Sequence, residues 1–365
     1  MSSNDIARQS TNLAFLASGA EFAFGDPAGL PLPAAQLAAL TPASPGVEAV
    51  MQSGLTAVVY KLRVDERCYA VKQARPRCLV RNADGQTSFL NELQRHAELA
   101  ALRAQDVVFP GVLAPLYGSL RHGVIVSPWI AGAPVDTFDR RRIRQLLATG
   151  SSLLAHGFFE WDFSPGNLLD DGAQTWIFDF GYMYRYDPLR ELNSAGNGRD
   201  APQFHLAERI ETRAAFAWLL RIGQEQGMDV ALERYAVLKE EAAASYAALR
   251  AQLAARGADA LVLAHYEAIV REWDEGTLPR LYLKEAWRSH TLDLYDDLHG
   301  KTCTPTTLAR ADWLLEAAFT QHAQLLALGA LSADDSRLSR DDLLARYRGH
   351  RASAERYQLP APAAG

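Results

Sequence analysis

The sequence predicts an α+β protein in which a small antiparallel sheet comes first and a large, mostly helical part follows. Thr56–Val64 is rich in β-branched and aromatic residues, and a polar turn at 65–67 leads into a second strand that ends near Gln73. From Leu206 onward the chain is a succession of Ala-, Leu-, Glu- and Arg-rich stretches with helical periodicity. Strands followed by a run of helices favour the α+β class.

Composition narrows the class of protein further. The 365 residues are 48% hydrophobic and 22% charged, as in a globular protein. The net charge of −6 gives no general attraction to nucleic acid, so no nucleic-acid partner is expected. No apolar run reaches the length of about 18 residues that a membrane span needs. The three cysteines form no C-x-x-C pair, and therefore indicate neither a zinc site nor a disulfide framework.

The start of the chain predicts a cytoplasmic protein. Residues 1–10 lack the basic stretch and apolar core of a secretory signal, although a polar, Ser-rich start leaves a specialised bacterial secretion signal open. Turn and breaker residues then divide the chain into four segments, 1–46, 47–130, 131–200 and 201–365. The first of these segments is rich in Pro and Gly, and we interpret it as an extension that packs on, or is tethered to, the sheet region.

The elements expected in order follow from local patterns. They are a short helix at 34–40, a hairpin at 56–73, a polar segment at 76–87 with a turn at Asp84-Gly85, a helix at 88–103, strands near 113–118 and 123–126, and a helix at 139–156 that Gly157 ends. In the C-terminal half, breaks between helices are expected near Gly227, Gly257, 276–279, 300–305 and Gly329. The basic cluster at 140–144 is expected to form a solvated face.

Three polar residues in the middle of the chain carry the main functional signal. Asp162 precedes Asn167 by five residues, with Pro165-Gly166 between them, and Asp179 follows an apolar strand and precedes Phe180-Gly181. One carboxylate that orients an attacking hydroxyl, together with an amide and a second carboxylate that hold magnesium, is the set that phosphoryl transfer from ATP needs. Asp170-Asp171-Gly172 reads as the hairpin turn between two strands.

In these motifs the chain resembles the protein-kinase-like superfamily, which includes protein kinases, aminoglycoside and choline phosphotransferases, and bacterial lipopolysaccharide sugar kinases. The resemblance implies a bilobal fold, with a kinase N-lobe at 47–130, a catalytic core at 131–200 and a helical C-terminal part at 201–365. It also implies ATP and Mg²⁺ as cofactors, Asp162 as the catalytic base, and Asn167 and Asp179 as metal ligands.

Upstream residues extend the resemblance to the nucleotide site. Tyr69-Ala70-Val71-Lys72 is similar to the V-A-I-K strand of kinases, whose lysine holds the α- and β-phosphates. Glu92, twenty residues later in a helical run, is expected to pair with Lys72. Glu98 on the same helix is the alternative partner, and the spacing favours Glu92.

Two backbone segments complete the predicted nucleotide site. Ser53, Gly54 and Thr56 lie in a loop similar to the S-G-L-T loop of choline and aminoglycoside phosphotransferases, and they offer amides and hydroxyls to phosphate oxygens. Only one glycine is present, against three in the protein-kinase loop. Pro128 and Ile130 resemble a kinase hinge, in which Pro128 would give a carbonyl to adenine and Ile130 an amide. The alternative interpretation of this stretch is an ordinary strand end.

Departures from the family pattern bear on the acceptor. Glu160-Trp161 stands where protein kinases have His-Arg, and no A-P-E segment follows Asp179. The resemblance therefore implies a hydroxyl acceptor on a small molecule or glycan, such as a lipopolysaccharide core sugar. The helical stretch 282–297 could build the acceptor pocket or be an ordinary amphipathic helix. The alternative functions are a diverged Ser/Thr protein kinase, which includes the case of a bacterial effector, and a nucleotide-binding pseudokinase.

Overall fold

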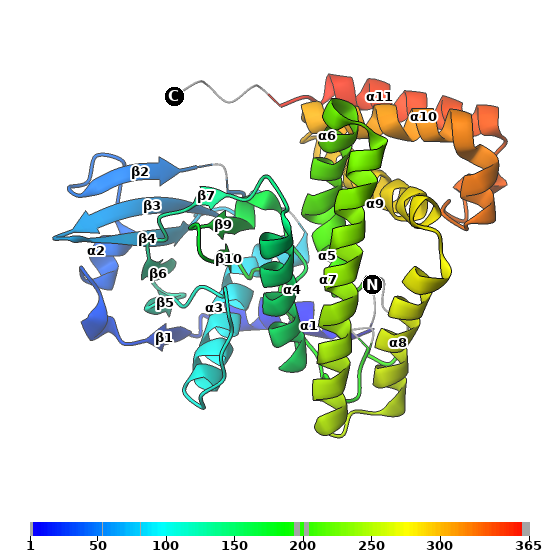
Figure 1. Cartoon of the computed structure of the whole chain (residues 1–365). Helices are drawn as coiled ribbons and strands as arrows, with labels where there is room; N and C mark the ends of the chain where they lie inside the picture. Colours follow the sequence, from blue (N-terminus) through cyan, green and yellow to red (C-terminus); the bar gives the residue numbers. More distant parts are fainter. Residues whose placement is uncertain (1–2, 53, 81, 193–197, 201–203, 360–365) are drawn as a thin grey trace. The chain divides into compact units, whose positions relative to one another are not determined.

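The computed structural model describes residues 3–52, 54–80, 82–192, 198–200 and 204–359 (Figure 1). The chain forms two compact units, the first made of Met1–Val135, Gln145–Leu206 and Ala251–Leu263, and the second of Asp136–Arg144, Ala207–Arg250 and Ala264–Gly365. The antiparallel sheet belongs to the first unit, and the long C-terminal helices belong mainly to the second. The α+β class is therefore confirmed, and the elements are consistent with the protein-kinase-like fold.

A six-stranded antiparallel sheet is the framework of the first unit. Its strand order is β1-β5-β6-β4-β3-β2. The strands are β1 (Ala23–Gly25), β2 (Val47–Met51), β3 (Ala57–Val64), β4 (Arg67–Ala74), β5 (Tyr117–Ser119) and β6 (Val124–Pro128). The predicted hairpin is confirmed as β3 and β4, whose register runs from Ala57 opposite Ala74 to Val64 opposite Arg67.

Alternation along β4 sends its side chains to opposite faces of the sheet. Val71 is fully buried in a cluster that includes Leu37 of α2 (Ala34–Ala38). Lys72 points to the other face, where α3 (Ala83–Arg103) brings Glu92 to 2.7 Å from its Nζ atom. The sheet therefore has α2 on one face and α3, together with Lys72, on the other.

The helix α3 begins at Ala83 rather than at Ser88, so the predicted turn at Asp84-Gly85 is wrong. The reason is a cap: the Asn82 side chain accepts a hydrogen bond from the backbone N–H of Gly85 at 2.8 Å, which satisfies a donor in the first turn. The glycine is needed there, because a Cβ atom would lie 2.2 Å from Cγ1 of Val80. Asp84 lies at the positive end of the helix dipole, which favours a carboxylate.

The N-terminal extension is more ordered than the sequence predicted. Besides α2 and the short 3₁₀ helix η1 (Pro27–Gly29), it forms α1 (Ser3–Ala17), which packs against α3. It also supplies β1, which pairs with β5 in the sheet. This pairing joins segments almost a hundred residues apart, which a local pattern cannot show. The strand expected at 113–118 starts only at Tyr117, because Pro115 has no N–H to donate.

Short strands make up most of the first unit after β6. Its remaining elements are β7 (Ala133–Pro134), β8 (Phe158–Phe159), η2 (Pro165–Asn167), β9 (Leu168–Asp170), β10 (Thr175–Ile177) and β11 (Tyr184–Arg185). The strands β9 and β10 form the predicted hairpin, and β8 pairs with β11. The helix α4 (Arg140–Ala155) agrees with the helix predicted at 139–156, and Gly157 follows it with a φ of +77°.

The second unit is helical, and glycines or prolines separate its helices where the sequence predicted breaks. Its elements are α5 (Leu206–Ile210), the π-helical segment η3 (Glu211–Ala215), α6 (Phe216–Gln226), α7 (Met228–Ala255), α8 (Ala260–Glu275), α9 (Leu278–Gly300), α10 (Pro305–Ala327), η4 (Asp335–Arg337) and α11 (Arg340–Arg356). The last three long helices pack around a core that contains Trp287, Leu314 and Tyr347, and α10 and α11 lie side by side (Figure 1). Among the described residues, no helix combines the length and apolar composition of a membrane span.

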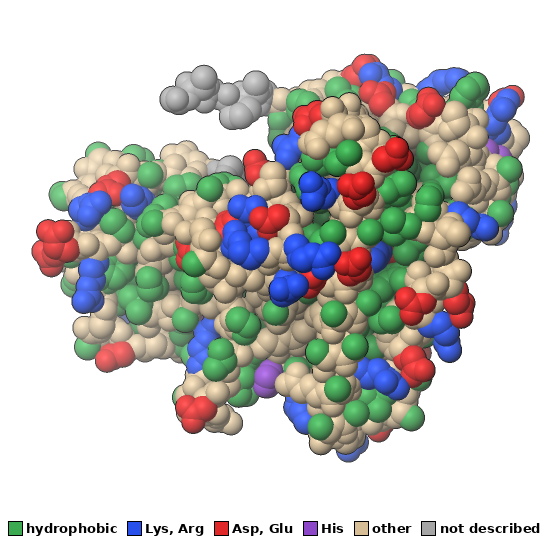
Figure 2. All heavy atoms as spheres, viewed as in Figure 1, with side chains coloured by type: hydrophobic (Ala, Val, Ile, Leu, Met, Phe, Trp, Pro, Cys, Tyr) green, Lys and Arg blue, Asp and Glu red, His purple; other side chains and the backbone are tan. Residues whose placement is uncertain are grey.

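The basic cluster on α4 is neutralised within its own unit. Arg140 pairs with Glu240 and Glu241 of α7, each at 2.7 Å, and Arg144 pairs with Glu241 at 2.8 Å. On the face shown in Figure 2, Lys and Arg side chains are interspersed with Asp and Glu. The cluster therefore forms a charge-balanced surface, in keeping with the predicted solvated face.

Candidate active site

Lys72 is the centre of the candidate site in the first unit. Its Nζ atom lies 2.7 Å from Oε2 of Glu92 and 2.8 Å from Oδ1 of Asp179. Burial alone would lower the pKa of Lys72, but the charges of Asp179 and Glu92 outweigh this and raise it. The ammonium is therefore charged at neutral pH. Three residues predicted from separate motifs, spread over more than a hundred positions, meet in one ion-paired cluster.

Glu92, and not Glu98, is the helix partner of Lys72. The Glu92 side chain is only 4% exposed, and burial would raise its pKa, but the positive charge of Lys72 lowers it overall. Glu98 is 39% exposed and pairs instead with Arg95 at 2.8 Å and with Arg185 at 3.4 Å. The two glutamates on α3 thus have separate partners.

Asp179 reaches this cluster at the end of the β9–β10 hairpin. Asn167 and Phe178 are linked across the hairpin, where the Phe178 N–H donates to the Asn167 carbonyl at 3.2 Å. Asn167 and Asp179 therefore lie at the same end of the hairpin. Asp179 has a φ of +66°, which is uncommon for a residue with a side chain. Such backbone strain concentrates at functional sites, where the surroundings hold it in place.

Asn91 fixes the segment that follows Asp179, a function that the sequence argument missed. Its Nδ2 atom donates to the carbonyls of Gly181 at 3.0 Å and Met183 at 2.9 Å, and more weakly to that of Phe180 at 3.4 Å. Asn91 is 2% exposed, so these are buried hydrogen bonds. Since Asn91 precedes Glu92 on α3, the same helix turn positions both Lys72 and the Asp179 segment.

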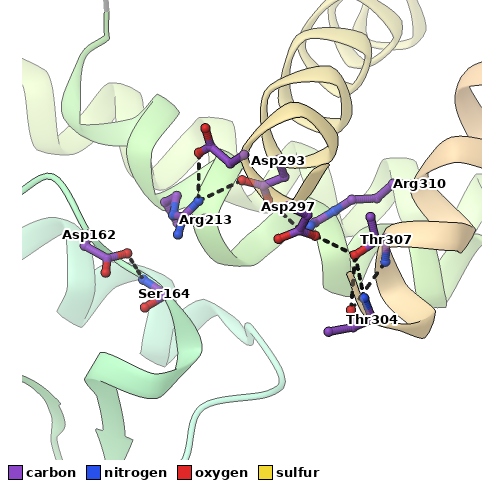
Figure 3. A network of polar contacts seen from close by, with 9 residues as sticks. Asp162, Ser164, Arg213, Asp293, Asp297, Thr304, Thr307 and Arg310 are labelled. Carbon is purple, nitrogen blue, oxygen red and sulfur yellow. Dashed lines mark hydrogen bonds and ion pairs between the residues drawn. The ribbon is translucent and has the colours of Figure 1, made fainter. Parts of the chain in front are cut away.

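Asp162 and Asn167 are held together as the sequence spacing implied. The Nδ2 atom of Asn167 donates to the backbone carbonyl of Asp162 at 3.1 Å and to its Oδ2 atom at 3.2 Å. The Ser164 N–H donates to Oδ1 of Asp162 at 3.2 Å (Figure 3). The amide nitrogen of Asn167 is used for orientation, so its carbonyl oxygen is the atom suited to a metal ion.

Glu160 holds the backbone of Asp162 in place. Its Oε1 atom accepts a hydrogen bond from the Asp162 N–H at 2.6 Å, and the side chain is almost fully buried. Burial raises the pKa of Glu160 well above its ordinary value, and the charges of Asp162 and Asp179 add to this effect. The sequence showed this residue only as a missing histidine, whereas the structure gives it a contact to the catalytic loop.

Tyr182 is a second residue whose position the sequence did not define. Burial, followed by the negative charge of Asp162, raises the pKa of Tyr182 to about 12. Its phenol therefore stays protonated at neutral pH and can donate a hydrogen bond.

The predicted phosphate loop is held in place by Arg75. The Nε atom of Arg75 donates to the Gly54 carbonyl at 2.8 Å, and the Thr56 carbonyl accepts the Arg75 N–H at 2.9 Å. A Cβ atom on Gly54 would lie 2.7 Å from the Ala57 carbonyl oxygen, so the glycine is required. Ser53 lies outside the described residues. Nearby, the Leu79 N–H donates to the Leu55 carbonyl at 3.0 Å.

A cavity adjoins this loop. It has a volume of about 470 Å³ and is lined by Arg77, Cys78, Leu79 and Gln86. Leu79 ties the cavity to the phosphate loop through its bond to Leu55, and Gln86 belongs to the first turn of α3. The space is large enough for part of a polar substrate, with a cation and an amide in its wall.

The predicted hinge residues follow β6, whose Pro128 lies opposite Tyr69 of β4. The Trp129 N–H donates to the Cys68 carbonyl at 3.0 Å. Because a trans peptide places its C=O and N–H on opposite sides, the carbonyl of Pro128 points away from Cys68.

The donor set fits magnesium better than zinc. Asn167 and Asp179 offer one amide oxygen and one carboxylate, and Mg²⁺ takes few protein ligands and completes its shell with phosphate oxygens and water. Over the described part of the chain, no cluster of three or more His, Cys, Asp or Glu side chains could hold a metal on its own. The side chain of Asp179 is 36% exposed, so it remains open to a ligand even while it contacts Lys72.

The polar stretch on α9 is mainly buried and structural. Asp293 pairs with Arg213 of η3 at 3.0 Å and with Arg310 of α10 at 2.6 Å (Figure 3). His290 is fully buried, and burial lowers its pKa well below the ordinary value. These contacts favour the amphipathic-helix interpretation of 282–297 for both residues.

Known protein-family models give no match to this chain, and neither do the curated proteins. Two solved structures of WbdD, one described as a bifunctional kinase-methyltransferase, are similar to it at 18% identity, with TM-scores of 0.33 and 0.32. Each alignment covers 54% of this chain and 46% of the WbdD chain, so the chain spans less than half of that protein. At these values the likeness carries no argument about activity.

Proposed function

We propose that this protein is an ATP- and Mg²⁺-dependent phosphotransferase whose acceptor is a hydroxyl group of a small molecule or glycan. The observation that carries the proposal is the cluster of Lys72, Glu92 and Asp179, with contacts of 2.7 and 2.8 Å at the lysine. Asp162 and Asn167, hydrogen-bonded to each other, complete the set of side chains that such a reaction uses.

In this proposal the nucleotide is held by both backbone and side chains. Pro128 and Ile130 bind adenine, while Gly54, Thr56 and Lys72 bind the phosphates. Glu92 keeps the Lys72 ammonium in place, and its burial makes that position rigid. When bound, magnesium would neutralise charge on the β- and γ-phosphates. Asn167 and Asp179 are the residues that would hold it.

The transfer step then belongs to Asp162. Its carboxylate accepts a hydrogen bond from the acceptor hydroxyl and orients the oxygen toward the γ-phosphorus. A bond forms between that oxygen and phosphorus, the bond to the β,γ-bridging oxygen breaks, and ADP leaves with the electron pair. The hydroxyl proton passes to Asp162, late in a loose transition state. Glu160 holds the backbone N–H of Asp162, and Asn167 holds its carboxylate, so that the side chain stays in one orientation.

The acceptor class follows from the segment after Asp179. Only four residues separate Asp179 from Tyr184 of β11, and no A-P-E sequence follows to build a peptide groove. We therefore propose a sugar or a similar polyhydroxy metabolite, of which a lipopolysaccharide core sugar is one example. A protein acceptor remains the alternative, and a pseudokinase would bind nucleotide without turnover.

Transfer of ³²P from [γ-³²P]ATP tests the proposal, with delipidated lipopolysaccharide core oligosaccharide and casein as parallel acceptors. We expect magnesium-dependent labelling of the sugar by the wild type, at least about 100-fold lower in Asp162→Ala because the aligning base is lost. Asp136→Ala, which removes an exposed aspartate of the second unit, is the matched control. Labelled casein alone would favour a protein kinase, and bound nucleotide without any transfer would favour a pseudokinase.

A further inference from the structure

The N-terminal helix α1 binds the first turn of α3 through two consecutive residues. Nη1 of Arg8 lies 2.8 Å from Oδ1 of Asp84, and Nε2 of Gln9 donates to Oδ2 of Asp84 at 2.9 Å. Both oxygens of one carboxylate are thus held from the same neighbouring helix. Gln9 and Asn12 are 9% and 5% exposed, so a polar face of α1 is buried in this contact.

Arg8 also contacts the catalytic segment. Its guanidinium carbon lies 4.2 Å from the centre of the Tyr184 ring, a cation–π geometry. Tyr184 follows Asp179 by five residues and pairs with Phe159 between β11 and β8. It also packs against Trp161, the residue before Asp162, at 6.2 Å between ring centroids. The Arg8 side chain therefore links α3 to Tyr184, which follows Asp179 in the sequence and packs against the residue before Asp162.

The position of α3 determines whether Glu92 meets Lys72. Asp84 and Glu92 lie eight residues apart on one helix, which is about 12 Å along its axis. The middle of α3 is fixed by the buried hydrogen bonds of Asn91, whereas the pair of Glu98 with Arg185 further along the helix is exposed. Its first turn is fixed by α1 and by the loop before Asn82. Loss of the α1 contact would leave the Asp84 end of the helix free to tilt.

We propose that α1, through Arg8 and Gln9, positions α3 so that Glu92 engages Lys72, and that residues 3–17 are in this way a positioning element of the nucleotide site. This proposal rests on the proposed function. Arg8 and Gln9 touch no substrate in it, and they act through Asp84 and Tyr184. A change that displaces α1 would lower nucleotide affinity while the sheet and the helical unit stay folded.

Two measurements test the proposal on the full chain carrying Arg8→Ala with Gln9→Ala. The first is amide hydrogen exchange over residues 83–95 without nucleotide, which we expect to speed up about three- to tenfold. The second is calorimetric binding of the Mg²⁺ complex of AMP-PNP, which we expect to weaken by a similar factor, with the Tm within about 3 °C of the wild type. Arg121→Ala is the matched control, because it removes another arginine–carboxylate pair of the same unit, Arg121 with Glu21 at 3.2 Å.

A charge exchange separates positioning from general stability. Arg8→Asp combined with Asp84→Arg should recover part of the AMP-PNP affinity that either single change loses, because the ion pair returns while the contact of Arg8 with Tyr184 does not. Unchanged exchange over 83–95 in the double alanine variant would overturn the inference, and so would a loss of Tm that accounts for the whole loss of affinity. If the wild type itself binds no AMP-PNP, the proposed function fails, while the exchange result still decides whether α1 positions α3.

Discussion

Replacement of Glu92 by glutamine tests the Lys72 cluster with the least change of shape. The variant keeps the side-chain volume and removes one charge 2.7 Å from Nζ of Lys72. At an effective dielectric constant near 20, two unit charges about 3 Å apart attract by about 6 kcal/mol before desolvation is subtracted. Breaking a buried pair costs about 3–5 kcal/mol net, and Lys72 keeps Asp179 at 2.8 Å, so we expect about 2–3 kcal/mol.

We expect this loss to appear as weaker binding of the Mg²⁺ complex of AMP-PNP, by about 30- to 150-fold, in isothermal titration calorimetry. Glu98→Gln is the matched control, because Glu98 lies on the same helix, is 39% exposed and pairs with Arg95. An exposed pair contributes about 0–1 kcal/mol, so the control should bind nearly as well as the wild type. Equal losses in the two variants would refute the assignment of Glu92 as the partner of Lys72.

Further predictions concern the supports of the site and the helical unit. Asn91→Ala should destabilise the fold by about 1–3 kcal/mol in urea unfolding, because it leaves buried carbonyls of the Asp179 segment unpaired, and Gln105→Ala, at an exposed position just after α3, should change little. Glu160→Gln should retain more of the ³²P transfer than Glu160→Ala, because the amide oxygen of glutamine can still accept the hydrogen bond from the Asp162 N–H; equal losses in the two variants would mean that this hydrogen bond is not what matters. Burial, reinforced by the charge of Glu285, raises the pKa of Glu211 to about 8, so its contribution to stability is complete below about pH 4.5 and is lost as the pH rises through 8, by up to about 1.4 kcal/mol per pH unit. The urea midpoint of the wild type should therefore fall between pH 5.5 and 8.5 more steeply than that of Glu211→Gln, and parallel profiles would contradict this pKa.

Local patterns were sufficient for much of the fold. The hairpin β3–β4, the helix α4 and the helix breaks at Gly227 and Gly257 follow from side-chain periodicity and from the backbone preferences of glycine. The start of α3 was misplaced because Asp84-Gly85 is a turn signal by itself and becomes helical only under the Asn82 cap. The helix α1 and the strand β1 were missed because their partners lie far away in the sequence.

Some residues of the candidate site could likewise be predicted from the sequence, and others could not. The residues of known motifs, such as Lys72 and Asp179, could be predicted from spacing, and the structure brings them into contact. Asn91, Glu160 and Arg8 could not be predicted, because their importance lies in what they touch. An asparagine on a helix, a buried glutamate and an arginine near the N-terminus give no signal until the carbonyls, the N–H group and the carboxylate that they bind are placed in space.

The most direct test of the central claim is the thermal stability of the purified protein with Mg²⁺ and ATP, measured beside Mg²⁺ alone, in the wild type and in Asp179→Ala. A ligand that binds only the folded state raises its stability, by about 2.7 kcal/mol at a concentration 100 times the Kd. Our account predicts a rise in Tm that requires both magnesium and ATP and disappears in the variant. An equal rise in Asp179→Ala, or none in the wild type at millimolar nucleotide, would contradict a magnesium–nucleotide site at Asp179.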